Sequence, residues 1–175
     1  MIEDQDEAYY IYGAGAFASG DNTFTEVDST STIVDHGPVT TARINIKAKA
    51  VADGDSASTS TYTNVDSNSD ISVLINFEQA SLEYDGVSYN ISNAKFIGIC
   101  LPDHVDLPDG PKNKVVVINH GETMDLDPTL DGNIAALSFQ AEVSGESTYF
   151  SADLGALAVE DTFSVSTFQI EAVLG

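Results

Sequence analysis

Strict alternation of apolar and polar residues is the feature that most constrains how this chain can fold. In the stretch VTTARINIKAKAVA, residues 39–52, the even positions from 42 onward carry alanine or isoleucine, whereas the odd positions include Arg43, Lys47 and Lys49. Successive side chains of a β-strand point to opposite faces of a sheet. The stretch therefore predicts a strand with one buried face and one solvated face.

The same alternation recurs elsewhere and predicts a chain built mainly from strands. Residues 71–77, ISVLINF, place their isoleucines, Val73 and Phe77 on one face, and residues 134–143, IAALSFQAEV, point their odd-numbered apolar residues inward. Asp85-Gly86 separates two alternating runs and suits the positive φ angles of a type I′ hairpin turn.

The C-terminal run TFSVSTFQIEAVL changes phase: Phe163 and Val165 are odd-numbered, whereas Phe168, Ile170 and Leu174 are even-numbered. One inserted residue would produce this change, so the pattern predicts a β-bulge near Ser166 and Thr167.

These patterns predict an all-β, mainly antiparallel sandwich or barrel of eight to ten strands, with no amphipathic helix of three turns. A jelly roll best suits the strand count and the length, and an immunoglobulin-like sandwich fits the spacing as well. We expect residues 1–175 to form a single domain. Two polar insertions are predicted, near 53–70, which is rich in Ser, Thr and Asp, and near 101–114, which holds three of the five prolines.

The charge of the chain limits its partners and its surroundings. Twenty-eight acidic residues face six basic ones, giving a net charge of −22, yet 42% of the residues are hydrophobic and can form a core. Nucleic acid and anionic membrane surfaces would be repelled, so we expect neither as a partner. In molar salt the Debye length falls to about 3 Å and the repulsion between carboxylates largely disappears. The composition therefore favours a high-salt environment.

The termini and the apolar runs give no targeting signal. The N-terminus, MIEDQDEAYY, lacks the basic and apolar regions of a secretory leader, and no run reaches the roughly 18 apolar residues of a membrane span. If Met1 is the natural start, the protein is made in the cytoplasm and does not insert into a membrane.

No catalytic motif is present, and we expect no enzymatic activity. Cys100 ends an apolar run, AKFIGIC, where a buried thiol behaves as a small hydrophobic residue. His36, His104 and His120 lie in turn-like sequences and have no metal-ligand spacing.

One weak cation motif stands out. Asp66, Asn68 and Asp70 have the spacing that opens a calcium-binding EF-hand loop, but Ile71 and Phe77 occupy the positions that require Gly and Glu. The motif predicts either a solvated polar turn or a weakly held Ca²⁺ or other cation, and no other cofactor is expected.

Two groups of residues are candidates for contacts between copies. Arg43, Lys47 and Lys49 form a line of cations on one side of one strand, with Lys47 about 6 to 7 Å from Lys49 and about 13 Å from Arg43. Such a line either guards an exposed edge or outer strand against aggregation, or meets an acidic surface such as a second copy. Tyr10 and Tyr12 alternate with Tyr9 and Ile11 in the segment YYIY, which predicts one face on the core and one available to a neighbour.

Taken over its whole length, the chain resembles the small virion proteins of viruses that infect halophilic archaea. The resemblance rests on its acidity, its length, its all-β patterning, an N-terminus without a leader and the lack of an active site. Two groups are similar, namely single-jelly-roll capsid subunits and the decoration or turret proteins of tailed viruses. No signature residue is shared, so no functional position is carried over.

The resemblance implies a structural protein of the virion, a capsid subunit that contacts copies of itself and other virion proteins. A decoration or turret protein is one alternative. An extracellular metal- or carbohydrate-binding β-sandwich module is another, although the chain has no Trp to form a sugar platform.

The charge predicts that salt stabilises the fold. We expect the midpoint of thermal unfolding to rise as NaCl increases from about 0.1 M to above about 1 M, because screening weakens the repulsion between carboxylates. A midpoint that stays constant or falls over this range contradicts the prediction of a high-salt environment.

Overall fold

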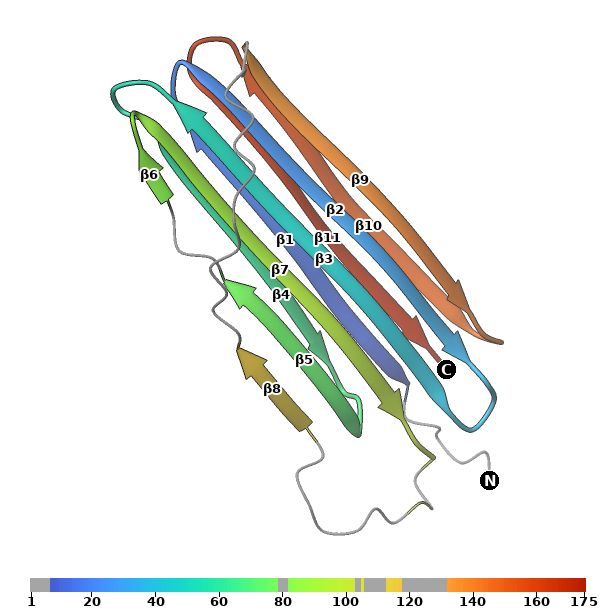
Figure 1. Cartoon of the computed structure of the whole chain (residues 1–175). Helices are drawn as coiled ribbons and strands as arrows, with labels where there is room; N and C mark the ends of the chain where they lie inside the picture. The colour runs from blue at the N-terminus through green and yellow to red at the C-terminus, as the bar shows by residue number, and fades with distance from the viewer. Residues whose placement is uncertain (1–6, 79–81, 103–104, 106–112, 118–131) are drawn as a thin grey trace.

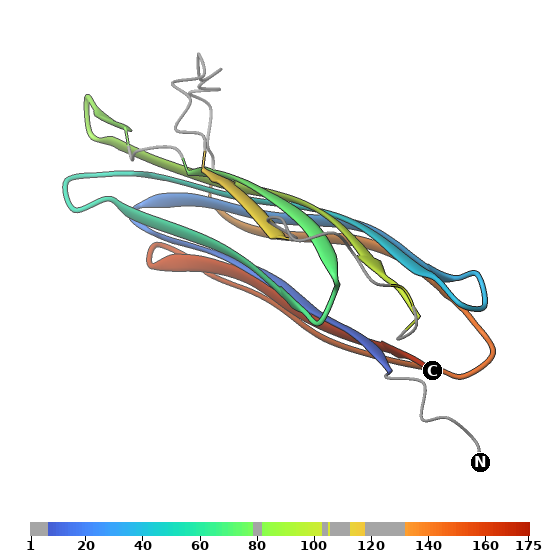
Figure 2. The same cartoon turned by 90° about the horizontal axis from the view of Figure 1, so that it is seen from below.

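The protein folds into two stacked β-sheets (Figures 1 and 2). The computed structural model describes residues 7–78, 82–102, 105, 113–117 and 132–175, and these contain eleven strands and no helix. Within this part of the chain there is accordingly no helix of the length and hydropathy needed to cross a membrane. The prediction of an all-β sandwich is confirmed, although the eleven strands exceed the predicted eight to ten. The jelly-roll connectivity stays a prediction.

The four-stranded sheet is antiparallel throughout and has the order β10-β11-β1-β4. Its strands are β1 (Ala8–Ser19), β4 (Ser58–Ser67), β10 (Thr148–Val159) and β11 (Phe163–Leu174).

The seven-stranded sheet has the order β8-β5-β7-β3-β2-β9, with the short β6 paired to β7. Two of its pairs, β5 with β8 and β2 with β9, are parallel, and the others are antiparallel. Its strands are β2 (Asn22–Asp35), β3 (Thr40–Asp53), β5 (Ile71–Glu78), β6 (Leu82–Tyr84), β7 (Val87–Cys100), β8 (Asn113–Val117) and β9 (Asn133–Ser144).

The core between the sheets is graded from large to small side chains. At one end, inward aromatic rings meet edge to face, Tyr10 with Phe96 at 6.2 Å and Tyr12 with Phe168 at 6.3 Å between ring centroids. Toward the other end alanine, serine and threonine take over the inward positions. The buried small residues at that end are Ala14, Ala16, Ala18, Ala48, Ala50, Ala52, Thr23, Thr25, Ser164 and Ser166.

The strand predicted to bulge is regular. β11 pairs residue for residue with both of its neighbours, so the prediction of a bulge near Ser166 and Thr167 is wrong. Ser166 occupies a buried position, and its hydroxyl lies 2.9 Å from that of Thr25 across the sandwich. Phe163 points outward and stacks on Phe17. The apolar pattern therefore changes face along β11 because the core accepts hydroxyls there, while the backbone keeps its register.

The predicted hairpin turn is confirmed, because Asp85 and Gly86 have φ angles of +52° and +76°. The predicted polar insertion at 53–70 needs correction, since most of it forms β4. The second insertion, near 101–114, lies mostly outside the described residues.

Hydroxyl residues explain why β4 is a strand despite its polarity. Its inward threonines bond to β7 of the other sheet. Thr61 donates to Asn90 Oδ1 at 2.8 Å, and Thr59 and Thr63 lie 2.9 and 3.1 Å from the hydroxyls of Ser88 and Ser92. A β-branched residue suits an extended backbone, and each inward hydroxyl has a partner. We call these three pairs the hydroxyl ladder.

The hydroxyl ladder should contribute measurably to stability. We expect Thr61→Val, which keeps the shape and removes the donor, to lower the free energy of unfolding by about 1 to 2 kcal/mol, because Asn90 loses its partner. Denaturant unfolding at high salt measures this change, and Ser60→Ala on the exposed face of the same strand is the control. An unchanged free energy of unfolding in Thr61→Val would show that the hydroxyl ladder does not contribute to stability.

Candidate functional site

All basic residues that the structure describes lie on one face of the molecule. Arg43, Lys47 and Lys49 come from β3, Lys95 from β7 and Lys114 from β8. The strand pairing places all five on the outer face of the seven-stranded sheet, since cross-strand partners share a face. The sixth basic residue, Lys112, lies outside the described residues. We call this surface the basic face.

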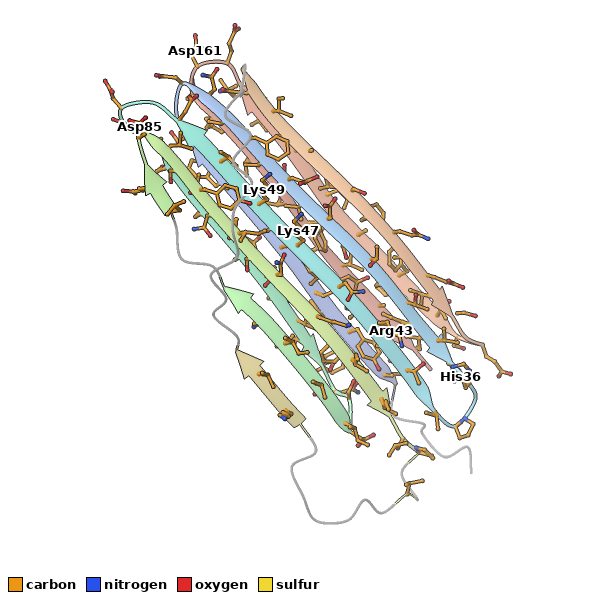
Figure 3. All side chains as sticks on the ribbon, viewed as in Figure 1. His36, Arg43, Lys47, Lys49, Asp85 and Asp161 are labelled. Atoms are coloured by element: carbon orange, nitrogen blue, oxygen red, sulfur yellow. The ribbon has the colours of Figure 1, made fainter. Side chains whose placement is uncertain are left out.

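The outward direction of the predicted cation line is confirmed, and β3 is an inner strand of its sheet. Figure 3 shows Arg43, Lys47 and Lys49 along β3, and the two flanking strands cover both edges of β3. A guard on an exposed edge strand is therefore ruled out for these residues. Their role at an interface stays a prediction.

Each cation of β3 has different neighbours. Lys47 lies opposite Asp28 and Lys49 opposite Glu26 on β2, whereas Arg43 lies opposite Thr32 and Ile97. Lys49 is half-buried, and its Nζ lies 5.3 Å from the Phe24 ring centroid and 5.6 Å from that of Tyr89. Lys49 therefore helps to hold the fold, while Arg43 and Lys47 are exposed.

Apolar residues accompany the cations at the β5 side of the basic face. The predicted shared face of β5 is confirmed for Ile71, Val73 and Ile75, but it points outward, next to Ile97 and Ile99 of β7. Leu74 is the residue that points to the core, opposite the buried Phe96. The basic face thus combines exposed cations with a partly exposed apolar surface.

Among the residues that the structure describes, no Lys or Arg lies on the opposite face of the molecule. None of the four strands β1, β4, β10 and β11 has a Lys, Arg or His. Three exposed carboxylates point outward from these strands, namely Asp66, Asp153 and Glu171. We call this surface the acidic face.

An apolar group adjoins the carboxylates on the acidic face. Leu157, Val165 and Phe17 form one cross-strand row, and Tyr62 lies across Gly15, where a Cβ atom would come within 2.3 Å of its ring. Phe17, Tyr62 and Leu157 are all exposed.

The core itself is open along one border, where β9 and β10 run side by side (Figure 1). Their inward residues are uncharged, and three large ones remain exposed: Phe139 at 37%, Phe150 at 41% and Leu154 at 48%. The other edge strand of the four-stranded sheet, β4, is joined to β7 by the hydroxyl ladder. We call the β9–β10 border the open edge. A single copy therefore leaves interior-type side chains in water.

Tyr10 and Tyr12 do not form an interface, contrary to the prediction. Both are fully buried, because the inward phase of β1 falls on the even positions. The Tyr10 hydroxyl lies 3.4 Å from Cys100 Sγ and accepts a bond from Ser69, and the Tyr12 hydroxyl bonds to Ser31. Burial raises the pKa of both tyrosines above the ordinary range, so both stay protonated at neutral pH.

The predicted cation motif is used for local structure. Asn68 accepts a bond from the Tyr9 amide and donates one to the Glu7 carbonyl, while Asp70 accepts a bond from the Leu101 amide at 2.8 Å. Asp66 points outward from β4. Nowhere in the described part of the chain do three or more His, Cys, Asp or Glu side chains gather in a group that could hold a metal ion.

The other chemically active side chains are dispersed. Cys100 is half-buried beside Tyr10 and packs against the core, as predicted for a small hydrophobic residue. His36 lies in the exposed β2–β3 turn, 3.5 Å from the Thr41 hydroxyl. His104 and His120 are outside the described residues.

Comparison with known proteins adds no identity. No family model, curated protein or solved structure matches the chain.

The open edge and the separation of charge between the faces are two features that the alternation pattern did not predict. The separation has a sequence signal, because every Lys and Arg lies between positions 43 and 114. The open edge has no comparable signal, because alternation shows which residues point inward but not which strands lie at a border.

Proposed function

We propose that this protein is a structural protein of a virion, a capsid subunit that assembles through repeated contacts between copies in a high-salt environment. The open edge is the observation that carries this proposal. Contact with a second copy would remove Phe139, Phe150 and Leu154 from water, and burial of apolar area is the main favourable term in association.

The charge of the chain supports the same reading. A protein with a net charge of −22 resists association in dilute buffer, and screening in molar salt removes that barrier. Uncharged inward positions on β9 and β10 keep carboxylates out of the contact, so copies can approach along this border once the remaining charges are screened.

A capsid role also agrees with the contacts that the described polar and charged side chains make within the fold. Several buried polar groups bond to one another across the sandwich, as in the hydroxyl ladder and the Thr25–Ser166 pair. Within the described residues the buried hydroxyls of Thr23, Ser29 and Ser164 have no hydrogen-bond partner. The side chains of the predicted cation motif bond to nearby backbone. The exposed features that remain are the two charged faces and the open edge, and all three suit contacts with other protein surfaces.

A charge placed at the open edge tests the proposal. We expect Leu154→Asp to abolish assembly of a chain that still folds, because the new carboxylate would be buried between copies. Val105→Asp is the matched control, since Val105 is 42% exposed and lies outside both sheets. Sedimentation at about 3 M and about 0.1 M NaCl measures assembly, and circular dichroism checks the fold.

The outcomes separate the alternatives. A wild-type chain that remains monomeric at both salt concentrations contradicts the proposal, as does normal assembly of Leu154→Asp. A discrete oligomer of a few copies in place of an extended lattice would fit a decoration or turret protein.

A further inference from the structure

The open edge is too small to hold copies together alone. Strands of twelve residues span about 40 Å, and the spacing of packed sheets is about 10 Å, so two facing edges bury roughly 800 Å² in total. Specific, stable interfaces bury about 1,200 to 2,000 Å². A subunit that assembles through this edge therefore needs a second contact.

We infer that the second contact pairs the acidic face of one copy with the basic face of the next, an inference that rests on the proposed function. The occupant of each face is thus a second copy of this chain. Two acidic faces together would oppose carboxylates with no cation between them. Two basic faces would oppose five cations on each side, although Glu26, Asp28 and Glu142 also point outward there. Only the pairing of unlike faces sets the carboxylates of the acidic face against the described cations.

The two charge groups have similar dimensions. On the acidic face, Asp66 and Glu171 both lie in register with Ile11, which places them on the strands either side of β1, and Asp153 lies one strand further along. Strand spacing and rise put these carboxylates about 8 to 10 Å from Glu171.

On the basic face, Lys95 lies opposite Asn45, midway between Arg43 and Lys47. The same spacings put Lys95 about 8 Å from each of them. Each face therefore carries a triangle of three exposed like charges of comparable size, next to apolar residues. On the basic face Lys114 and Glu142 are exposed as well.

The area also fits. Four strands at about 4.8 Å spacing and about 40 Å in length give the acidic face roughly 750 Å², or about 1,500 Å² for both partners, within the range of a stable contact. On the basic face the exposed part is the end that carries Arg43, Lys95 and Ile97. At the other end of that face Val51, Tyr89 and Ile91 are already buried.

A contact between unlike faces is heterologous and repeats from copy to copy. Such contacts generate closed rings or open arrays, depending on the rotation between neighbours. The open edge would then join copies in a second direction. Together the two contacts provide the repeated neighbours that a lattice requires.

Reciprocal charge exchange tests this pairing. The basic-face variant carries Arg43→Glu, Lys47→Glu and Lys95→Glu, and the acidic-face variant carries Asp66→Lys, Asp153→Lys and Glu171→Lys. Lys49 is left intact because it contacts Phe24 and Tyr89 in the fold. Sedimentation is measured at the lowest NaCl concentration at which the wild type is folded and assembled.

Each variant alone should associate about tenfold or more weakly than the wild type, since its two faces now carry like charge. An equimolar mixture should assemble like the wild type, because each face of one variant then meets a face of opposite charge on the other. Asp55→Lys with Glu146→Lys and Glu160→Lys, all in turns, is the control with the same change of net charge as the acidic-face variant, and it should assemble normally.

Normal assembly of both face variants, or a mixture that does not recover, would overturn the pairing while leaving the proposed function intact. A wild-type chain that never assembles would overturn both. If a triple variant loses its folded circular dichroism spectrum, the single changes Lys95→Glu and Asp153→Lys carry the same comparison.

Discussion

The contact between the two sheets is the interaction on which the rest of the structure depends. It is made by inward residues at every second position of strands twelve to fourteen residues long, in unbroken register. Because many of these residues are alanine, serine or threonine, large side chains fill only one end of the core. Small side chains bury little apolar area per residue, so each large apolar side chain that stays exposed removes a sizeable part of the stabilisation that burial could provide. In a single copy this unburied apolar area is found at the open edge.

The distribution of charge follows from the same division into two sheets. Every described cation lies on the outer face of the seven-stranded sheet, and the strands of the four-stranded sheet have none. A uniformly acidic surface would repel every copy from every other. Separation of the cations to one side leaves two unlike faces. Opposite charges that are partly buried in a contact are screened much less than separated charges, so such a molecule has a preferred orientation toward its neighbours in salt. Solubility in salt and directed association can then coexist in one chain.

The sequence predicts local structure well wherever alternation decides it. The strand through Arg43, its outward cations and the Asp85-Gly86 turn are all confirmed. The wrong predictions of a bulge and of a loop share one cause. Hydrophobicity alone does not show where a Ser or Thr side chain can occupy a buried position. Buried hydroxyls at Ser164 and Ser166 produced a false bulge, and threonines that bond across the sandwich made β4 resemble a loop.

The same limit applies to the candidate sites. Tyr10 and Tyr12 have polar tips that suit an interface, yet Ser31, Ser69 and Cys100 provide partners for them within the core. The choice of border strands depends on contacts between residues far apart in the chain. No local sequence pattern in β9 or β10 indicates that their inward residues remain exposed.

Backbone hydrogen exchange in the assembled and dissociated states tests most directly whether a second copy completes the core. Amide protection reports local opening, which is easiest at strands that lack a partner. If a second copy completes the core, protection rises on assembly in β9 and β10 by more than it rises at the hydroxyl-ladder border at β4. Protection that rises as much at β4 as along β9 and β10, or nowhere along β9 and β10, would contradict this.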